Sequence, residues 1–396
     1  MRAAWLLALA LLWPTLGEAE GSWRFSPEIA LEGRFFAQGP QFPGQFERVQ
    51  GSVILSGDLR WTSGDRATRL LVEPYVRFDH QDDGRSYADL REGSLSHRRG
   101  DWDFLAGVSQ VFWGVAESRN VVDIINQFDT VEDFDEGEKL GQPMLRIGRA
   151  TDFGTFEAYY LPVFRAREFP GRAGRLRPGL PIDEGAAEFE RGGEVFAGDV
   201  ALRYTHRFGD FDLGLHSFYG TNRSPILRPN PAGTALTPFY PRLIQGGLDL
   251  QYTSGPWLLK LEAIGADTAG STFAAMVGGV EYTFFDIARS GVDLGLIGEY
   301  LYDSRDQARA PVTLFENDAF AGTRITLNDI QDTELLAGAI VDTGSTAVIG
   351  SVEFQRRIGE RLLLEVEGRY FLGSDDPLVA PLLDDDHLQV RLTWFF

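Results

Sequence analysis

Apolar and polar residues alternate along much of this chain with a period of two. Between Val49 and Trp61 the odd positions are Val, Gly, Val, Leu, Gly, Leu and Trp, whereas the even positions include Gln50, Asp58 and Arg60. The last segment, LQVRLTWFF at residues 388–396, shows the same alternation. A period of two predicts β-strands that have one apolar face and one polar face.

The pattern recurs often enough to predict about 18 strands, with 16 as the alternative count. The predicted strands cover residues 23–38, 47–62, 67–80, 86–98, 102–114, 144–152, 154–164, 197–208, 211–221, 243–253, 256–265, 272–285, 292–304, 318–327, 332–342, 346–358, 361–373 and 386–396. Alternate connections are short, whereas the other set holds the long loops at 115–143, 165–196, 221–242 and 305–317. An even strand number with short periplasmic turns and long extracellular loops is typical of an all-β, antiparallel transmembrane β-barrel.

A soluble β-sandwich would also accept such strands, and the polar face distinguishes the two folds. Around the turn FGDF we pair Phe208 with Phe211, and around TSGP we pair Tyr252 with Trp257. These registers place Arg207 opposite Asp212, Arg203 opposite His216 and Asp249 opposite Lys260, and all six residues should face the lumen. Facing opposite charges stabilise strand pairing, and aromatic residues beside the turns fit a membrane interface, so both features favour the barrel.

The N-terminal segment predicts the compartment. Residues 1–19 have the form of a secretory signal peptide, because Arg2 precedes an apolar run and Gly17 and Ala19 supply small residues before a cleavage site. We expect this segment to be removed, leaving residues 20–396 as one barrel domain in the bacterial outer membrane.

Composition excludes several classes of protein. The chain has no cysteine, so it forms neither disulfides nor thiolate metal sites. After the N-terminal segment no apolar run is long enough for a transmembrane helix. The net charge of −21 argues against nucleic acid as a partner, because binding a polyanion requires a basic surface.

Two long loops carry opposite charge. Loop 115–143 is acidic, and its members Asp123, Asp129, Glu132, Asp133 and Asp135 are candidates for a pore constriction. Within it Val121, Ile124, Ile125 and Phe128 recur at helical spacing, which predicts an amphipathic turn that could dock on the inner wall. The loop at 165–196 concentrates arginines, and those at the same rim are Arg165, Arg167, Arg172, Arg175 and Arg177. Together the loops would select polar solutes by charge; alternatively, both are solvated external loops that contact lipopolysaccharide.

Other chemistry has weaker support in the sequence. Asp129, Asp133 and Asp135 offer oxygen ligands for calcium, but their spacing matches no complete calcium-loop signature, so we predict no metal and no cofactor. His216 should face an arginine, and His206 should lie on the apolar face. Neither arrangement activates a nucleophile, so we predict no enzyme activity.

One segment carries a family resemblance. The stretch DLREGSLSHRRGDWDFLAGVSQVFWGVAESRNVVDIINQFD, residues 89–129, resembles a segment of porin-like, largely uncharacterised proteobacterial outer-membrane proteins. In those proteins a hairpin ends in Gln and Trp-Gly and is followed by an Asn-x-x-Asp loop, here Gln110, Trp113, Gly114, Asn126 and Asp129. The family's Gly-Arg-Gln run is GVSQ here, so its arginine is missing. The C-terminal VRLTWFF is similar to the signal by which the barrel-assembly machinery recognises such barrels.

The resemblance implies a barrel with a transport role, and the polar strand faces agree with it. We therefore predict a porin-like channel for passive passage of small polar or charged solutes, surrounded by outer-membrane lipid and lipopolysaccharide. The alternatives are a non-conducting structural barrel and a barrel enzyme of the lipase or protease type.

Overall fold

The computed structural model describes residues 21–396 except 133–136, 191–195, 197 and 374. The predicted signal peptide lies outside the described residues. In the described part the barrel strands are β1 (Gly21–Phe36), β2 (Val49–Ser63), β3 (Thr68–Asp79), β4 (Tyr87–Arg99), β5 (Trp102–Ser109), β6 (Gln142–Thr151), β7 (Gly154–Leu161), β9 (Asp199–Phe208), β10 (Phe211–Thr221), β13 (Arg242–Ser254), β14 (Trp257–Thr268), β15 (Ser271–Phe284), β16 (Asp293–Asp303), β17 (Asn317–Thr326), β18 (Glu334–Asp342), β19 (Val348–Ile358), β20 (Leu362–Leu372) and β21 (His387–Phe395).

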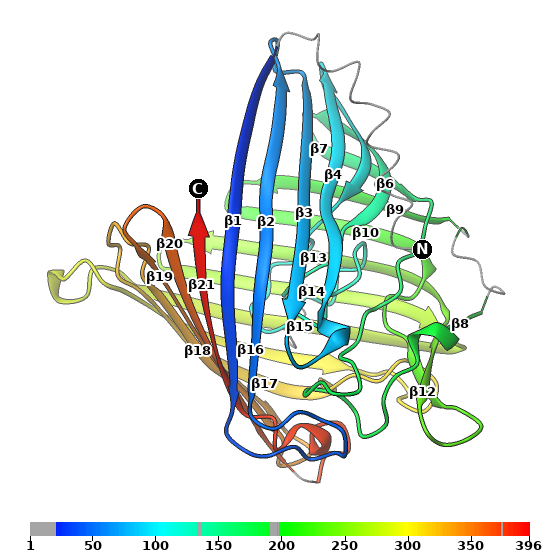
Figure 1. Cartoon of the computed structure of the whole chain (residues 1–396). Coiled ribbons are helices and arrows are strands. Elements are labelled where there is room, and N and C mark those ends of the chain that lie inside the picture. The colour runs from blue at the N-terminus through cyan, green and yellow to red at the C-terminus, as the bar shows by residue number, and fades with distance from the viewer. Residues whose placement is uncertain (1–20, 133–136, 191–195, 197, 374) are drawn as a thin grey trace.

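These strands form one closed antiparallel sheet. Each strand pairs with its neighbours in the chain, and β1 also pairs with β21, so that Leu31 lies opposite Leu392 across this seam. Figure 1 shows the seam where the blue β1 lies beside the red β21. Within the described residues the sheet has 18 strands, which confirms the predicted fold class and the higher of the two predicted counts.

The alternation of side chains separates an apolar outside from a polar inside. Leu31, Leu55 and Leu296 are exposed on the outer face. The intervening positions point inward, and Glu32 and Ser52 among them are buried. Exposed apolar side chains in such numbers form the lipid-facing belt of a membrane barrel. No helix in the described part of the chain is long and apolar enough to cross a membrane.

The long loops add a small second sheet that the sequence pattern did not predict. It consists of β8 (Glu188–Phe189), β11 (Ile226–Pro229) and β12 (Leu236–Tyr240), with Tyr240 paired to Phe189. The short 3-10 helices are η1 (Asp83–Arg85), η2 (Glu184–Ala186), η3 (Ile287–Arg289) and η4 (Ala380–Leu382). This second sheet joins the loops after β7 and β10 into one rim.

One predicted register is confirmed and the other is wrong. Phe208 pairs with Phe211, as expected. Around TSGP, however, Trp257 pairs with Ser254 and Tyr252 with Leu259, so Asp249 lies opposite Glu262 instead of Lys260. The cause is Gly255, whose φ of +55° permits a two-residue turn where a four-residue turn was predicted.

Candidate pore and its constriction

The segment between β5 and β6 leaves the wall and enters the lumen. β5 ends at Ser109, five residues before the predicted end of this strand, and the chain returns to the wall at Gln142. The described residues between them form no helix, so the helical turn predicted around Ile124 is wrong. We call the described residues of this segment, 110–132 and 137–141, the lumen loop.

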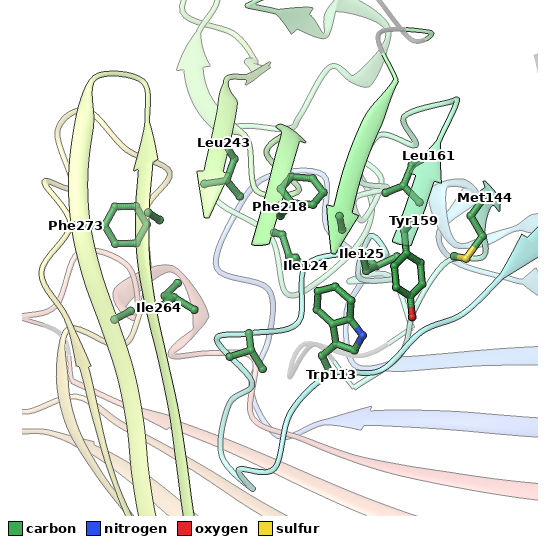
Figure 2. Close-up of a cluster of buried hydrophobic side chains, with 14 residues drawn as sticks. Trp113, Ile124, Ile125, Met144, Tyr159, Leu161, Phe218, Leu243, Ile264 and Phe273 are labelled. Carbon is green, nitrogen blue, oxygen red and sulfur yellow. The ribbon is translucent and has the colours of Figure 1, made fainter. Parts of the chain in front are cut away.

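An apolar cluster docks the lumen loop on the inner wall (Figure 2). From the loop, Trp113, Val122, Ile124 and Ile125 are buried. They meet wall residues of seven strands, namely Met144, Tyr159, Leu161, Ala201, Phe218, Leu243, Ile264, Ala266, Phe273 and Ala275. Burial of each large apolar side chain contributes about 1.5–3 kcal/mol, which offsets the entropy of ordering the loop. The predicted docking of this loop is therefore present, although it does not use a helix.

A charged network holds the far end of the loop against the opposite wall. The Glu132 carboxylate accepts hydrogen bonds from Arg77 Nε at 2.6 Å, from the Tyr75 hydroxyl at 2.6 Å and from the Tyr87 hydroxyl at 2.7 Å. Arg391 on β21 lies 3.2 Å from the same carboxylate. Glu132 is thus bound by three strands on both sides of the seam.

Arginines also surround the next carboxylate of the network. Arg77 has a fully buried side chain and contacts Glu32 at 2.9 Å, while Arg85 contacts the same Glu32 at 2.7 Å. Burial raises the pKa of the loop residue Glu132, but Arg77 and Arg85 outweigh burial and hold this pKa well below its usual value. The loop carboxylate therefore stays ionised across the physiological pH range.

The other predicted acidic residues of the lumen loop are also bound. Asp129 accepts hydrogen bonds from the Tyr87 hydroxyl at 2.7 Å and from Arg91 at 2.6 Å. Asp123 is buried and forms an ion pair with Lys139. Asp133 and Asp135 lie outside the described residues, so the structure does not test the weak calcium candidates Asp129, Asp133 and Asp135.

The predicted arginines of loop 165–196 do not form one cluster in the structure. Arg175 is buried and bonded to Asp385 at 2.5 Å and to the backbone carbonyl of Glu47 at 2.6 Å, so it joins three external loops. Arg165 contacts Asp89 at 2.8 Å on the wall, and Arg172 is exposed. Only Arg167 and Arg177 of this set line the outer of the two cavities described below.

The predicted lumen residues form two ion pairs, Arg203 with Asp249 and Arg207 with Asp212, while His216 and Lys260 each have other partners. Arg203 on β9 reaches Asp249 on β13 at 2.6 Å, across the intervening strand β10. Gly214 of β10 makes this possible, because a Cβ there would lie 2.4 Å from both side chains. His216 is buried against Trp113, with 5.3 Å between ring centroids, and contacts Gln245.

The remaining lumen residues differ in exposure. Arg207 and Asp212 form a loose, exposed pair with 3.8 Å between their charged atoms. Lys260 lies 3.5 Å from Glu117 of the lumen loop and 3.6 Å from Glu281. Lys260 therefore links the barrel wall to the loop, whereas the Arg207 pair lies at the short-turn rim.

Two cavities remain beside the lumen loop, along the wall formed by β17 to β21. The outer cavity, of about 480 Å³, lies among the long loops. The inner cavity, of about 440 Å³, lies toward the short turns. Both are lined by Glu117, Leu336 and Glu353, so the two cavities meet at these residues. We call this place the junction.

The two cavities carry opposite charge. Among the described residues, the outer cavity is lined by Arg119, Arg167, Arg177 and Arg369, with only the two junction glutamates in opposition. The charged lining of the inner cavity consists of Glu117, Glu132, Glu138, Glu334, Glu353, Glu365, Glu367, Arg324 and Arg391. A cavity with a basic and apolar lining therefore adjoins one with an acidic lining.

The sequence analysis did not identify most of the wall residues that hold the lumen loop in place. Glu32, Arg77 and Arg391 each occupy polar positions of predicted strands, so the alternation could have placed them inside. Their mutual contact depends on closure of the seam, which brings together residues 359 positions apart in the chain.

Comparisons with known proteins agree with this architecture. No protein-family model and no curated protein sequence matches the chain. A BenF-like porin from Pseudomonas fluorescens superposes with a TM-score of 0.56 at 10% identity, covering 95% of this chain and 98% of that chain. OccAB1 of Acinetobacter baumannii gives 0.55 at 8% identity, covering 96% and 98%.

A third similar structure has a different described role. Wzi of Escherichia coli, described as a carbohydrate-binding β-barrel involved in group 1 capsule assembly, superposes with a TM-score of 0.54 at 11% identity, covering 99% of this chain and 88% of that chain. These likenesses concern the fold. With its closed 18-stranded sheet and apolar belt, the chain is a β-barrel of the bacterial outer membrane with the fold of porins.

Proposed function

We propose that this chain is an outer-membrane channel for passive passage of small polar or charged solutes, and not an enzyme. The observation that carries the proposal is the pair of cavities that meet at the junction beside the lumen loop. Their charged lining suits polar solutes, and the porin fold of the similar structures supports a transport role. Lipid, lipopolysaccharide and the barrel-assembly machinery are its expected partners.

The junction is the narrow part of the proposed passage. Loop residue Glu117 approaches it from one side, and Leu336 of β18 and Glu353 of β19 form the wall on the other. The acidic residues of the lumen loop and the arginines Arg167 and Arg177 then act in sequence along the passage. This arrangement replaces the direct facing of acidic and basic loops that the sequence predicts.

Planar-bilayer recording tests the proposal. Folded wild-type protein should give discrete conductance steps, and Leu336→Trp should lower the step size because it adds volume at the junction. The matched control is Leu335→Trp, one residue away on the lipid side of the same strand, since Leu335 alternates with Leu336 and shares its face of β18 with the exposed Val341. Equal effects of both substitutions would contradict the assigned route.

A non-conducting barrel is the second candidate, because the lumen loop is anchored on opposite walls. Glu132 binds the wall at β3, β4 and β21, while residues 115–118 bind β14 and β16 on the far side. Folded protein, identified by a shift in SDS gel migration on heating, that shows no conductance at any voltage would favour this candidate.

A further inference from the structure

Two wall carboxylates bind consecutive backbone amides of the lumen loop. Glu262 of β14 accepts hydrogen bonds from the amides of Val115 at 2.7 Å and Ala116 at 2.9 Å, and its other oxygen accepts one from Val122 at 3.3 Å. Glu299 of β16 accepts hydrogen bonds from the amides of residues 117 and 118, both at 2.8 Å. The Ser118 hydroxyl adds a bond of 2.6 Å to Glu299. Four successive amides are therefore held by two carboxylates.

These carboxylates have no ion-pair partner within 4 Å among the described residues, although both are buried. Lys260, on the same wall, contacts Glu117 and Glu281 instead. A buried carboxylate is costly unless hydrogen bonds compensate its charge, and here the loop amides supply them. Without the loop, Glu262 and Glu299 would lose the hydrogen bonds that compensate their charge. These two wall carboxylates therefore stabilise the docked position of the loop.

The residue that this arrangement fixes is Glu117. Its neighbours in the chain are bound on either side, and its own amide is bound by Glu299. Its carboxylate contacts Arg324 at 2.6 Å and Lys260 at 3.5 Å, and it lines both cavities at the junction. Its charge thus faces every ion that crosses the junction.

We propose that Glu262 and Glu299 are positioning residues that hold Glu117 at the junction and thereby set the ion preference of the channel. The proposal rests on the channel function proposed above. Neither positioning residue lines either cavity, so their effect on selectivity must act through the loop. If Glu117 leaves the junction, Arg324 and Lys260 lose a counter-charge, and the passage becomes more favourable to anions.

The test compares Glu117→Gln with the double variant Glu262→Gln and Glu299→Gln. Glutamine keeps the size of the side chain but replaces one accepting oxygen with an NH2 donor. Under a KCl gradient, both variants should shift the reversal potential toward anions, and the double variant should also show a larger and noisier conductance. If the double variant does not fold, the single variant Glu299→Gln replaces it in both the reversal-potential and the labelling measurements.

Loop position is read out separately, by thiol labelling. The chain has no cysteine, and Val122 is fully buried, so Val122→Cys reports only on loop displacement. Labelling should accelerate by about tenfold or more in the double variant, since hydrogen bonds to charged groups are lost. The matched control is Glu281→Gln on β15, the strand between β14 and β16. Glu281 is also a lumen-facing carboxylate, but it has no hydrogen bond to the described residues of the loop. Labelling of Val122→Cys should therefore stay slow in this control.

The outcomes separate the two proposals. Slow labelling and an unchanged reversal potential in the double variant, with a conducting wild type, would overturn the positioning role alone. A shift in Glu117→Gln without one in the double variant would do the same. A wild type that folds but does not conduct would overturn the channel function and this inference together.

Discussion

Glutamate 132 offers the most direct perturbation of the lumen loop. Glu132→Gln removes a charge that compensates Arg77, whose side chain is fully buried. Among the described residues, Arg77 would then retain only Glu32 as an ion-pair partner. Breaking a buried ion pair by removing one member costs about 3–5 kcal/mol. At about 1.4 kcal/mol per factor of ten, the docked state of the loop should lose about two to three and a half powers of ten in its equilibrium with released states.

Trypsin resistance measures this equilibrium. Between residues 115 and 143 the sequence offers trypsin Arg119 and Lys139, and Lys139 is buried when the loop is docked. Folded wild-type protein should therefore resist cleavage in the loop, whereas Glu132→Gln should be cut there and should give a noisier channel. Glu138→Gln is the control, because it makes the same change at an exposed position of the same loop. Equal resistance of Glu132→Gln and wild type would refute the anchoring role of this network.

Three further measurements follow from the fold. Leu296→Arg, on the lipid side, should destabilise the barrel by about 2–4 kcal/mol in refolding titrations if it lies near the bilayer midplane, whereas Gln251→Arg in the lumen should be nearly neutral; similar values would invalidate the assigned faces. Trp113→Ala should weaken loop docking by about 3–5 kcal/mol and raise trypsin cleavage. Because the pKa of Glu132 is lowered, its contribution to docking is complete above the ordinary carboxyl pKa and is lost only as pH falls through the lowered value. The difference in trypsin cleavage between wild type and Glu132→Gln should therefore be the same at about pH 5 as at pH 7.

The strands were predictable because each depends on its own residues. Alternation between lipid and lumen is imposed along the whole length of a barrel strand, so the period of two persists even where glycines interrupt it, as at Gly51 and Gly57. The register at FGDF was predicted correctly because the turn there is tight. The predicted register at TSGP was wrong because the length of the turn depends on the backbone conformation of Gly255, which the sequence does not specify.

The site was less predictable because the lumen loop is shaped by its surroundings. The spacing of Val121, Ile124, Ile125 and Phe128 fits a helix, but the apolar side chains of this stretch pack on the wall without one. At its start the amide of Val122 binds the wall carboxylate of Glu262, which gives this amide an acceptor outside a helix. The acidic character of the loop was evident, but its partners on β1, β3, β4 and β21 were not, since they converge only in the closed barrel.

The seam between β1 and β21 has a consequence for assembly. Glu32 of β1 and Arg391 of β21 contact each other at 2.7 Å across it, and Arg391 also contacts Glu132 of the lumen loop. A barrel that closed with the loop outside would leave Arg77 and Arg391 in the lumen without Glu132, one of the two carboxylates that each of them contacts. Closing the sheet and docking the loop should therefore favour each other, because the pairing of β1 with β21 brings together residues that bind Glu132.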